Sequence, residues 1–296
     1  HLWSLAWYTE EPLNDAAVLP NFLIEKALGE HVTVSLNGTG GDELFAGYGR
    51  YFQLPVEKHY MHIPAIVRRD LIEPLVGLMS PMRAWQLGRA ELFKQSRGAY
   101  LHAHTTHFPP PLLAMIGHTS GPVNPVQVNA ANAFLSQCPA ADLQTIGLAA
   151  DLGSYLVEDL LTLLDRTAMA VSVEGRVPFL DHRFVEAALG VPADIRTPGA
   201  QQKFLERRIA GPLLPESVIH APKRGFVSPV PSWFKGDVGK AAARLLTSRR
   251  SLDRGWWTAE GISQLMRAPD RHAYRVYSLL MLELSVRMFI DQPLAD

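Results

Sequence analysis

The 296-residue sequence predicts an α/β protein that is mostly helical, because one β-branched run is surrounded by long stretches of helical periodicity. Apolar residues at helical spacing run from residue 20 to Gly29, and the run VTVSL at residues 32–36 follows as a strand. That strand leads directly into a glycine-rich loop, NGTGGDE, which begins at Asn37. A helix, a strand and a glycine loop in this order favour a nucleotide site.

The rest of the chain is predicted to be helical. Helices interrupted at Pro64, Pro74 and Pro81 are expected from residue 51 to about 108, followed by an irregular connection over residues 108–128. Helical periodicity covers residues 140–170, breaks at VEGRVPFLDHR, and returns near Phe184, over residues 201–210 and from about residue 238 onward, with a proline-rich break at APKRGFVSPVPSW. We therefore predict one domain over residues 1–296, in which 1–51 form the edge of an α/β nucleotide-binding portion and 52–296 a mainly helical portion.

Composition narrows the class of protein. The net charge is −1, from 28 basic and 29 acidic residues, so the overall charge does not favour binding to nucleic acid or to an anionic membrane. The apolar segment at residues 277–290 contains Glu283 and Arg287, which predicts a buried C-terminal helix rather than a membrane span. A single cysteine, Cys138, excludes an internal disulfide and a cysteine-rich metal site. These features predict a soluble, cytoplasmic protein.

The first residues, HLWSLAWYTEEPL, include no initiator methionine and resemble the interior of a domain. We expect the chain to be part of a longer protein.

The glycine loop has the composition of a phosphate-binding loop. Gly38, Gly40 and Gly41 leave backbone N–H groups uncovered, and a helix that starts after them adds a positive dipole end. Asp42 is a candidate ligand of Mg²⁺, which prefers carboxylate oxygens shared with phosphates. The alternative is a tight β–α turn with Asp42 as the helix N-cap. The loop lacks the Lys-Ser/Thr pair of a Walker motif.

Three blocks resemble the synthetase domain of glutamine-dependent asparagine synthetases. They are VTVSLNGTGGDELFAGYGRY at residues 32–51, YLVEDLLTLLDRTAMAVSVEGRVPFLDHRFVEAAL at 155–189 and APKRGFVSPVPSWF at 221–234, and the segment EEPLNDAAVLPNFLIEKAL at 10–28 is also similar. The resemblance implies the C-terminal portion of a synthetase domain whose α/β fold is adenine-nucleotide alpha-hydrolase-like, a Rossmann-like fold of the PP-loop type. It also implies a reaction in which the aspartate side-chain carboxylate attacks ATP, pyrophosphate leaves, and ammonia then displaces AMP.

The resemblance assigns roles by matching position. Asn37, Gly38, Gly40 and Gly41 are expected to hold ATP, and Asp42 is expected to hold Mg²⁺. Lys223, in the loop PKRGF, matches a lysine that reaches the phosphates, where its charge offsets the negative charge on the leaving pyrophosphate. It is the first catalytic candidate, and the others are Thr39, Asp159 and Asp165.

The sequence departs from the family at two points. Thr39 stands where these synthetases usually have an acid between the loop glycines, and threonine is no base at neutral pH. The pyrophosphate loop of the form S-G-G-x-D-S and the N-terminal cysteine of the glutaminase domain are absent from these residues. The expected partners are aspartate or a related carboxylate, and ammonia from a glutaminase domain outside this chain; a homodimer is a further expectation.

Two alternatives to asparagine synthesis stay open. One is a related synthetase that adenylates another carboxylate for amide or lactam formation, which Thr39 favours. The other is a non-catalytic remnant that keeps the fold as a binding module.

Some charged residues allow two interpretations. The set either forms partly buried ion pairs or lines a site for a zwitterionic amino acid, and it consists of Asp165, Arg166, Glu174, Arg176 and Asp181. In a structural interpretation, Arg176 and Asp181 hold the VPFLD turn against the helices. Glu158 and Asp159, with Asp165, are better placed for the cleft. The HAHTTH group at residues 102–107 lacks the spacing of a metal site, so we predict surface or capping histidines.

Overall fold

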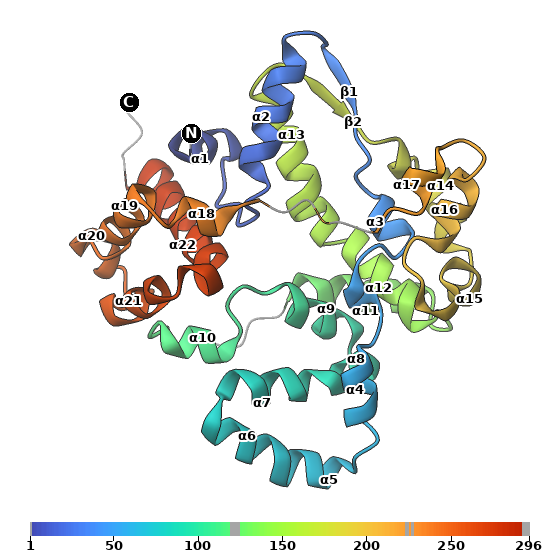
Figure 1. Ribbon diagram of the computed structural model, residues 1–296, viewed down its shortest axis with the longest axis horizontal. Helices are drawn as coiled ribbons and strands as arrows, with labels where there is room; N and C mark the ends of the chain where they lie inside the picture. Colours follow the sequence, from blue (N-terminus) through green and yellow to red (C-terminus); the bar gives the residue numbers. More distant parts are fainter. Residues whose placement is uncertain (1, 119–124, 223–224, 226–227, 292–296) are drawn as a thin grey trace.

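The computed structural model describes residues 2–118, 125–222, 225 and 228–291, in which one two-stranded sheet lies at the edge of a mostly helical molecule (Figure 1). The elements of the first part are α1 (Leu2–Thr9), α2 (Val18–Gly29), β1 (Val34–Leu36), α3 (Gly41–Leu44), η1 (Gly49–Tyr51), α4 (Pro55–Tyr60), α5 (Ala65–Val67), η2 (Arg68–Ile72), α6 (Glu73–Met79), α7 (Pro81–Gly88), η3 (Arg89–Glu91), α8 (Leu92–Gln95), α9 (Arg97–Thr105), α10 (Pro110–Met115) and α11 (Val126–Gln137).

The remaining elements carry the second and third sequence blocks and the C-terminal helices. They are α12 (Leu143–Leu152), η4 (Leu156–Leu161), α13 (Thr162–Met169), β2 (Glu174–Arg176), η5 (Pro178–Leu180), α14 (His182–Leu189), α15 (Ala193–Arg196), η6 (Pro198–Ala200), α16 (Phe204–Ala210), α17 (Glu216–Ile219), α18 (Val230–Trp233), α19 (Asp237–Leu246), α20 (Arg249–Leu252), α21 (Ala259–Arg267) and α22 (Pro269–Phe289). Among the described residues, no helix combines the length and apolar character needed to cross a bilayer.

The sheet consists of two parallel strands. β1 pairs with β2, with Val34 opposite Glu174 and Leu36 opposite Arg176. The sequence pattern predicted β1 two residues too long and read the β2 segment only as a break between helices. A three-residue strand centred on Gly175 has no periodicity of its own, so its pairing with β1 is what makes it a strand. The sheet therefore includes a segment from the portion that was expected to be helical.

The long C-terminal helix α22 lies in the main hydrophobic core, as the sequence predicted. Tyr277 and Met281 on this helix are fully buried, and they belong to a cluster that also includes residues of α1, α2 and α18–α21. A second cluster joins Tyr51, after the glycine loop, to α9 and α12. A third joins Leu44 to α14. The two smaller clusters hold the segment that follows the glycine loop from two sides.

One helix lies where an irregular connection was expected. α10 occupies residues 110–115, with Pro109 as its N-cap and Pro110 as its first residue. Proline favours that position because the first N–H of a helix has no intrahelical partner. The prolines therefore mark the start of a helix, not the predicted break.

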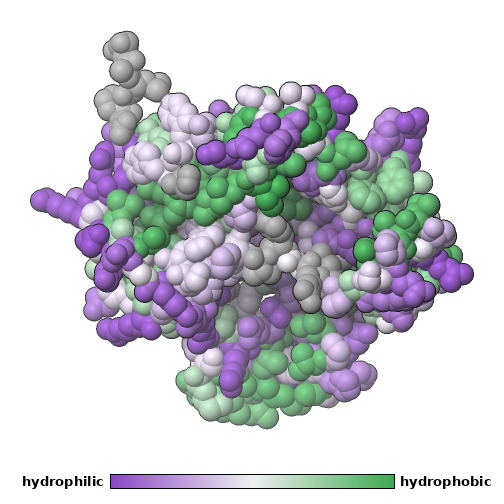
Figure 2. Space-filling view, turned by 45° about the horizontal axis from the view of Figure 1, so that its top comes forward, coloured by the Kyte–Doolittle hydropathy of each residue, from purple (hydrophilic) through white to green (hydrophobic). Residues whose placement is uncertain are grey.

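Helices α4–α7 form an arm that extends away from the body (Figure 1). Hydrophobic residues gather on its surface in Figure 2, and the side chains of Ile66, Leu78 and Met79 are 75%, 86% and 82% exposed.

Candidate functional site

The glycine loop closes by an Asx turn at the end of β1. The Asn37 side-chain oxygen accepts hydrogen bonds from the backbone N–H and the hydroxyl of Thr39, at 2.9 and 2.7 Å. Gly40 then adopts a left-handed conformation with φ of 96°, which glycine permits at low cost, and α3 begins at Gly41. The Thr39 hydroxyl is thus engaged in shaping the loop.

The loop glycines serve different purposes. A Cβ at Gly40 would lie 2.4 Å from Cδ2 of Leu180, so the absence of a side chain there allows η5 to pack closely. A Cβ at Gly38 would meet nothing within 4 Å, and the residue is exposed. Among the described residues, no neighbouring atom requires Gly38 to lack a side chain. Its exposed backbone is therefore open to a ligand.

Asp42 is not the helix N-cap, which corrects the alternative interpretation. Gly40 holds that position and Asp42 is the second residue of the four-residue helix α3, too short to add much dipole. The Asp42 Oδ1 atom instead lies 2.9 Å from Nζ of Lys203, which is also 3.2 Å from Oε2 of Glu206. The three side chains are 18–24% exposed, so they form a largely shielded charge cluster beside the loop.

Sequence reasoning missed Lys203, because it lies at the start of a helix far along the chain with no motif around it. Its backbone has a left-handed φ of 57°, and its N–H donates to Phe45 O at 3.1 Å. The Gln202 side chain donates to Gly47 O at 3.0 Å. A Cβ at Gly47 would lie 1.9 Å from Oδ1 of Asp42, so that glycine makes room for the ion pair.

A network of largely buried side chains connects Glu43, on α3, to Asp151, on α12. Glu43 is 1% exposed, and burial raises the pKa of its carboxyl although Tyr48 hydrogen-bonds it. The ring of Tyr48 packs edge-on against Tyr155, with centroids 6.2 Å apart. The Arg50 guanidinium lies 4.0 Å from the Tyr48 ring centroid and pairs with Asp151 at 2.8 Å.

Asp159 and Tyr155 both line a cavity of about 780 Å³. Glu158 and Asp15 line the same cavity. Burial raises the pKa of Asp159 to about 7, with smaller contributions from the charges of Asp15 and Glu11. Burial raises the pKa of Tyr155, and the charges of Asp15, Asp159 and Glu43 raise it further.

Two other catalytic candidates, Thr39 and Asp165, do not line the cavity that contains Asp159. Asp165 is exposed on α13 and does not line that cavity. Lys223 lies outside the described residues, so its position stays a prediction.

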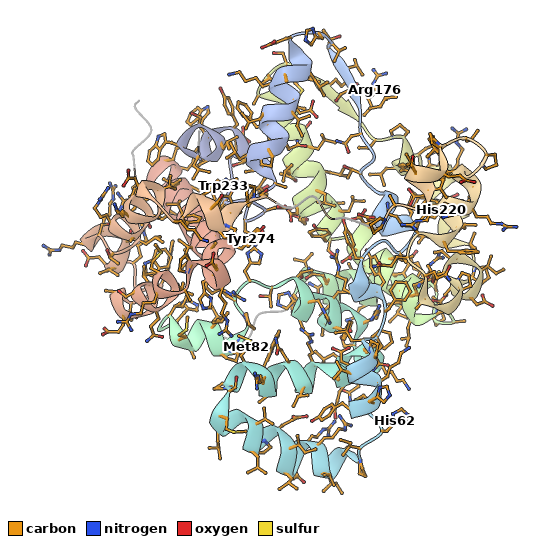
Figure 3. The ribbon with its side chains drawn as sticks, in the orientation of Figure 1. His62, Met82, Arg176, His220, Trp233 and Tyr274 are labelled. Carbon is orange, nitrogen blue, oxygen red and sulfur yellow. The ribbon has the colours of Figure 1, made fainter. Side chains whose placement is uncertain are left out.

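The ion pairs of the middle block differ from the expected ones. Arg176, which is labelled in Figure 3, pairs with Glu174 on exposed β2 at 2.9 Å, and Asp181 pairs with Arg183 at 3.0 Å. Asp181 also caps α14 by accepting from the Arg183 N–H. Arg176 therefore does not hold the VPFLD turn as expected, because it pairs on its own strand, whereas Asp181 joins the end of this turn to α14 by capping that helix.

The histidine group is dispersed among separate partners. His107 contacts the Ser278 hydroxyl at 2.7 Å, and His104 packs against the ring of Tyr100. Within the described ranges, no three His, Cys, Asp or Glu side chains are positioned to share a metal ion.

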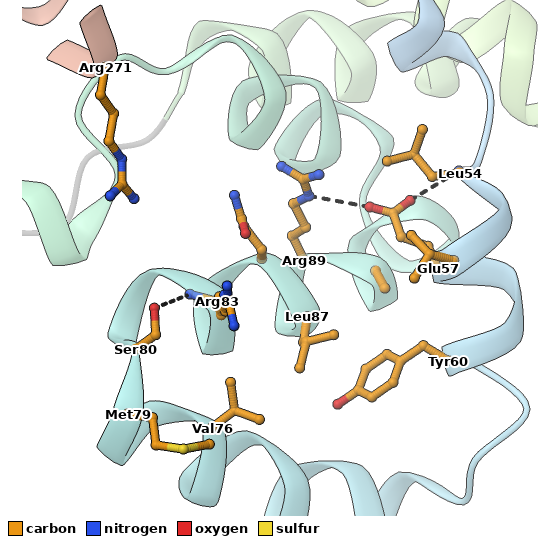
Figure 4. Close-up of a pocket in the computed structure, with 13 residues that line it drawn as sticks. Leu54, Glu57, Tyr60, Val76, Met79, Ser80, Arg83, Leu87, Arg89 and Arg271 are labelled. Atoms are coloured by element: carbon orange, nitrogen blue, oxygen red, sulfur yellow. Dashed lines mark hydrogen bonds and ion pairs between the residues drawn. The ribbon is translucent and has the colours of Figure 1, made fainter.

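A second cavity, of about 830 Å³, lies in the arm and is lined by no candidate residue. Glu57 and Arg89 pair across its wall at 3.2 Å (Figure 4). The arm helices supply most of its lining, so this cavity is separate from the glycine loop.

Comparison with known proteins relates this chain to asparagine synthases. The sequence model of a family described as asparagine synthase matches residues 1–287. Glutamine-hydrolysing asparagine synthetase 1 of Bacillus subtilis (strain 168) is 28% identical over 249 residues, which cover 80% of this chain and 37% of that protein. Glutamine-hydrolysing asparagine synthetase of Gallus gallus is 42% identical over 77 residues, 24% of this chain and 14% of that protein. The longer matches cover most of this chain. The chain itself spans little more than a third of the length of those relatives. The match to nearly the whole chain confirms the resemblance of the sequence blocks, and the chain belongs to the asparagine synthase family.

Proposed function

We propose that this chain takes part in ATP-dependent amide formation, in which the side-chain carboxylate of aspartate is activated as an adenylate and ammonia then replaces AMP. The proposal rests on family membership and on the glycine loop at the end of β1. The observation that carries it is the open backbone of Gly38, in the loop that leads to the shielded carboxylate of Asp42; together they offer a backbone N–H donor and a candidate metal ligand.

Each candidate residue has a role in this proposal. Asn37, Gly38, Gly40 and Gly41 hold the nucleotide, with the Asx turn fixing the loop. Asp42 offers a carboxylate to Mg²⁺, which when bound neutralises charge on the phosphates.

The remaining roles concern the reacting groups. Lys203 orients the Asp42 carboxylate, and Lys223 is assigned to the leaving pyrophosphate. Thr39 is assigned to face the carbonyl group that the amine attacks. Asp159 and Asp165 are assigned to bind the amino-acid substrate.

A second candidate function is activation of a different carboxylate for amide or lactam formation. Thr39 favours it, because a hydroxyl already bonded to Asn37 is a poor replacement for an acid that handles an incoming ammonia molecule.

The test uses the protein expressed from its complete reading frame. Pyrophosphate release from ATP is measured with aspartate, with other carboxylates and with no carboxylate. Asp42→Asn is expected to lower aspartate-dependent release at least a hundredfold, whereas Asp237→Asn, on an exposed pair, leaves it unchanged. Release that depends on another carboxylate supports the second candidate. Release that is equal with and without any carboxylate contradicts both.

A further inference from the structure

The cavity in the arm has a largely apolar wall. Figure 4 shows Tyr60 of α4, Val76 of α6 and Leu87 of α7 pointing into the space between these helices. Val56 and Met79 line the same cavity and are 65% and 82% exposed, so much of their apolar surface is in contact with water. A ligand that covers this surface is favoured by the hydrophobic effect. The volume of about 830 Å³ is large enough for a small molecule.

The acidic charge of the cavity is already offset. Of the described residues that line it, only Glu57 carries a carboxylate, and its Oε1 atom lies 3.2 Å from Nε of Arg89. The other oxygen accepts hydrogen bonds from the Tyr100 hydroxyl at 2.7 Å and from the Leu54 N–H at 3.2 Å. Glu57 and Arg89 therefore form a satisfied pair in the wall and leave no net charge.

Two further arginines add positive charge to the cavity. Arg83 lies on α7, and Arg271 lies in the first turn of α22, which belongs to the body of the molecule. Figure 4 shows the Arg271 side chain extending from α22 toward the arm. Within the part of the chain that the structure describes, neither guanidinium has an ion-pair or hydrogen-bond partner. Two separate parts of the fold thus bring uncompensated cations to one apolar cavity.

We propose that this cavity binds an alkyl carboxylate, whose chain covers the apolar wall and whose carboxylate accepts hydrogen bonds from Arg83 and Arg271. A guanidinium suits this head group, because its N–H donors match the two oxygens of a carboxylate. An inorganic anion would leave the apolar wall in water, and a neutral lipid would leave both cations unpaired. The cavity is separate from the glycine loop, so this inference does not depend on the proposed function.

Binding is tested by calorimetric titration with octanoate, on the protein expressed from its complete reading frame. Saturable binding is expected, and hexanoate is expected to bind about tenfold more weakly because two fewer CH₂ groups cover the wall. The uncharged probe of the same length, n-octanol, is expected to bind about tenfold more weakly or less, since it leaves the arginines unpaired. No saturable binding, equal binding of octanoate and n-octanol, or equal binding of octanoate and acetate overturns the proposal.

Two pairs of variants locate the site. Replacing both Arg83 and Arg271 with glutamine is expected to weaken octanoate binding about tenfold or more, whereas Arg267→Gln, at an exposed arginine outside the cavity lining, leaves it unchanged. Met79→Asp places a carboxylate in the wall and is expected to weaken binding about tenfold, whereas Leu78→Asp, at an 86% exposed neighbour outside the lining, leaves it unchanged.

All five of these side chains are exposed, so the variants are expected to fold, and thermal unfolding checks this. Octanoate binding that persists in both cavity variants overturns the proposal. Binding that falls equally in the cavity variants and in their controls also overturns it, because the probe then binds the outer apolar surface of the arm.

Discussion

Nζ of Lys203 lies 2.9 Å from Oδ1 of Asp42, so the start of α16 is joined to the glycine loop by an ion pair between residues far apart in the sequence. The contact is reinforced by the backbone hydrogen bond from Lys203 to Phe45 and by the space left at Gly47. It fixes the direction of the one loop carboxylate assigned to Mg²⁺.

Replacing Lys203 with methionine is expected to lower the free energy of unfolding by about 1–2 kcal/mol, because Asp42 and Glu206 lose their cation in a shielded place. Denaturant unfolding of the chain measures this. The control is Lys240→Met, whose pair with Asp237 is exposed and is expected to contribute less than about 0.5 kcal/mol. Equal losses in the two variants would show that the Lys203 pair is no stronger than a surface pair.

Replacing Gly47 with alanine is expected to displace the Asp42 carboxylate, since the new Cβ would lie 1.9 Å from Oδ1. The expected loss in the free energy of unfolding is about 1–3 kcal/mol. Gly49→Ala is the matched control, because there the nearest heavy atom lies 3.9 Å from the new Cβ. A Gly47→Ala chain as stable as the native one contradicts the close packing described here.

Asp159 is expected to reduce stability at alkaline pH. Burial raises the pKa of its carboxyl to about 7, whereas the unfolded chain ionises it near pH 4, so the folded protein holds an extra proton between these values. Stability therefore falls as pH rises through this window, and the cost is complete above it. The neighbouring charges of Asp15 and Glu11 act in the same direction.

Asp159→Asn is accordingly expected to raise the free energy of unfolding at pH 8, by on the order of 2 kcal/mol, and to leave it nearly unchanged at pH 4. Thermal unfolding at the two pH values measures the difference, with Asp165→Asn, on an exposed site, as the control. A gain of the same size at both pH values would mean that the effect does not come from ionisation.

Thr39→Glu in the complete protein is expected to raise the ratio of asparagine to AMP about tenfold with ammonia as the donor, because an acid at this position can orient the amine or accept its proton. The substitution also removes the hydroxyl bond to Asn37. Thr39→Gln loses the same bond without adding an acid, so it separates the two effects. A ratio that stays unchanged or falls in the Glu form favours the second candidate function.

The sequence by itself located the glycine loop, the helix before it, the buried C-terminal helix and the family. These features are local: a run of periodic apolar residues predicts a helix, and a cluster of glycines predicts a loop, whatever the rest of the chain does. The same local reading failed at residues 110–115, where prolines begin a helix rather than interrupt one.

Only the tertiary structure decided which distant residues meet. β2 is a strand because β1 lies beside it, Asp42 meets Lys203 rather than capping its own helix, and Asp15 shares a cavity with Asp159. Neither Lys203 nor Asp15 belongs to a pattern that marks a site, since an isolated lysine or aspartate is usually a solvated surface residue. Burial is what makes these two charges important, because it strengthens the interaction of a charge with its neighbours. The segments that bury them are distant in the sequence, so the local sequence does not reveal it.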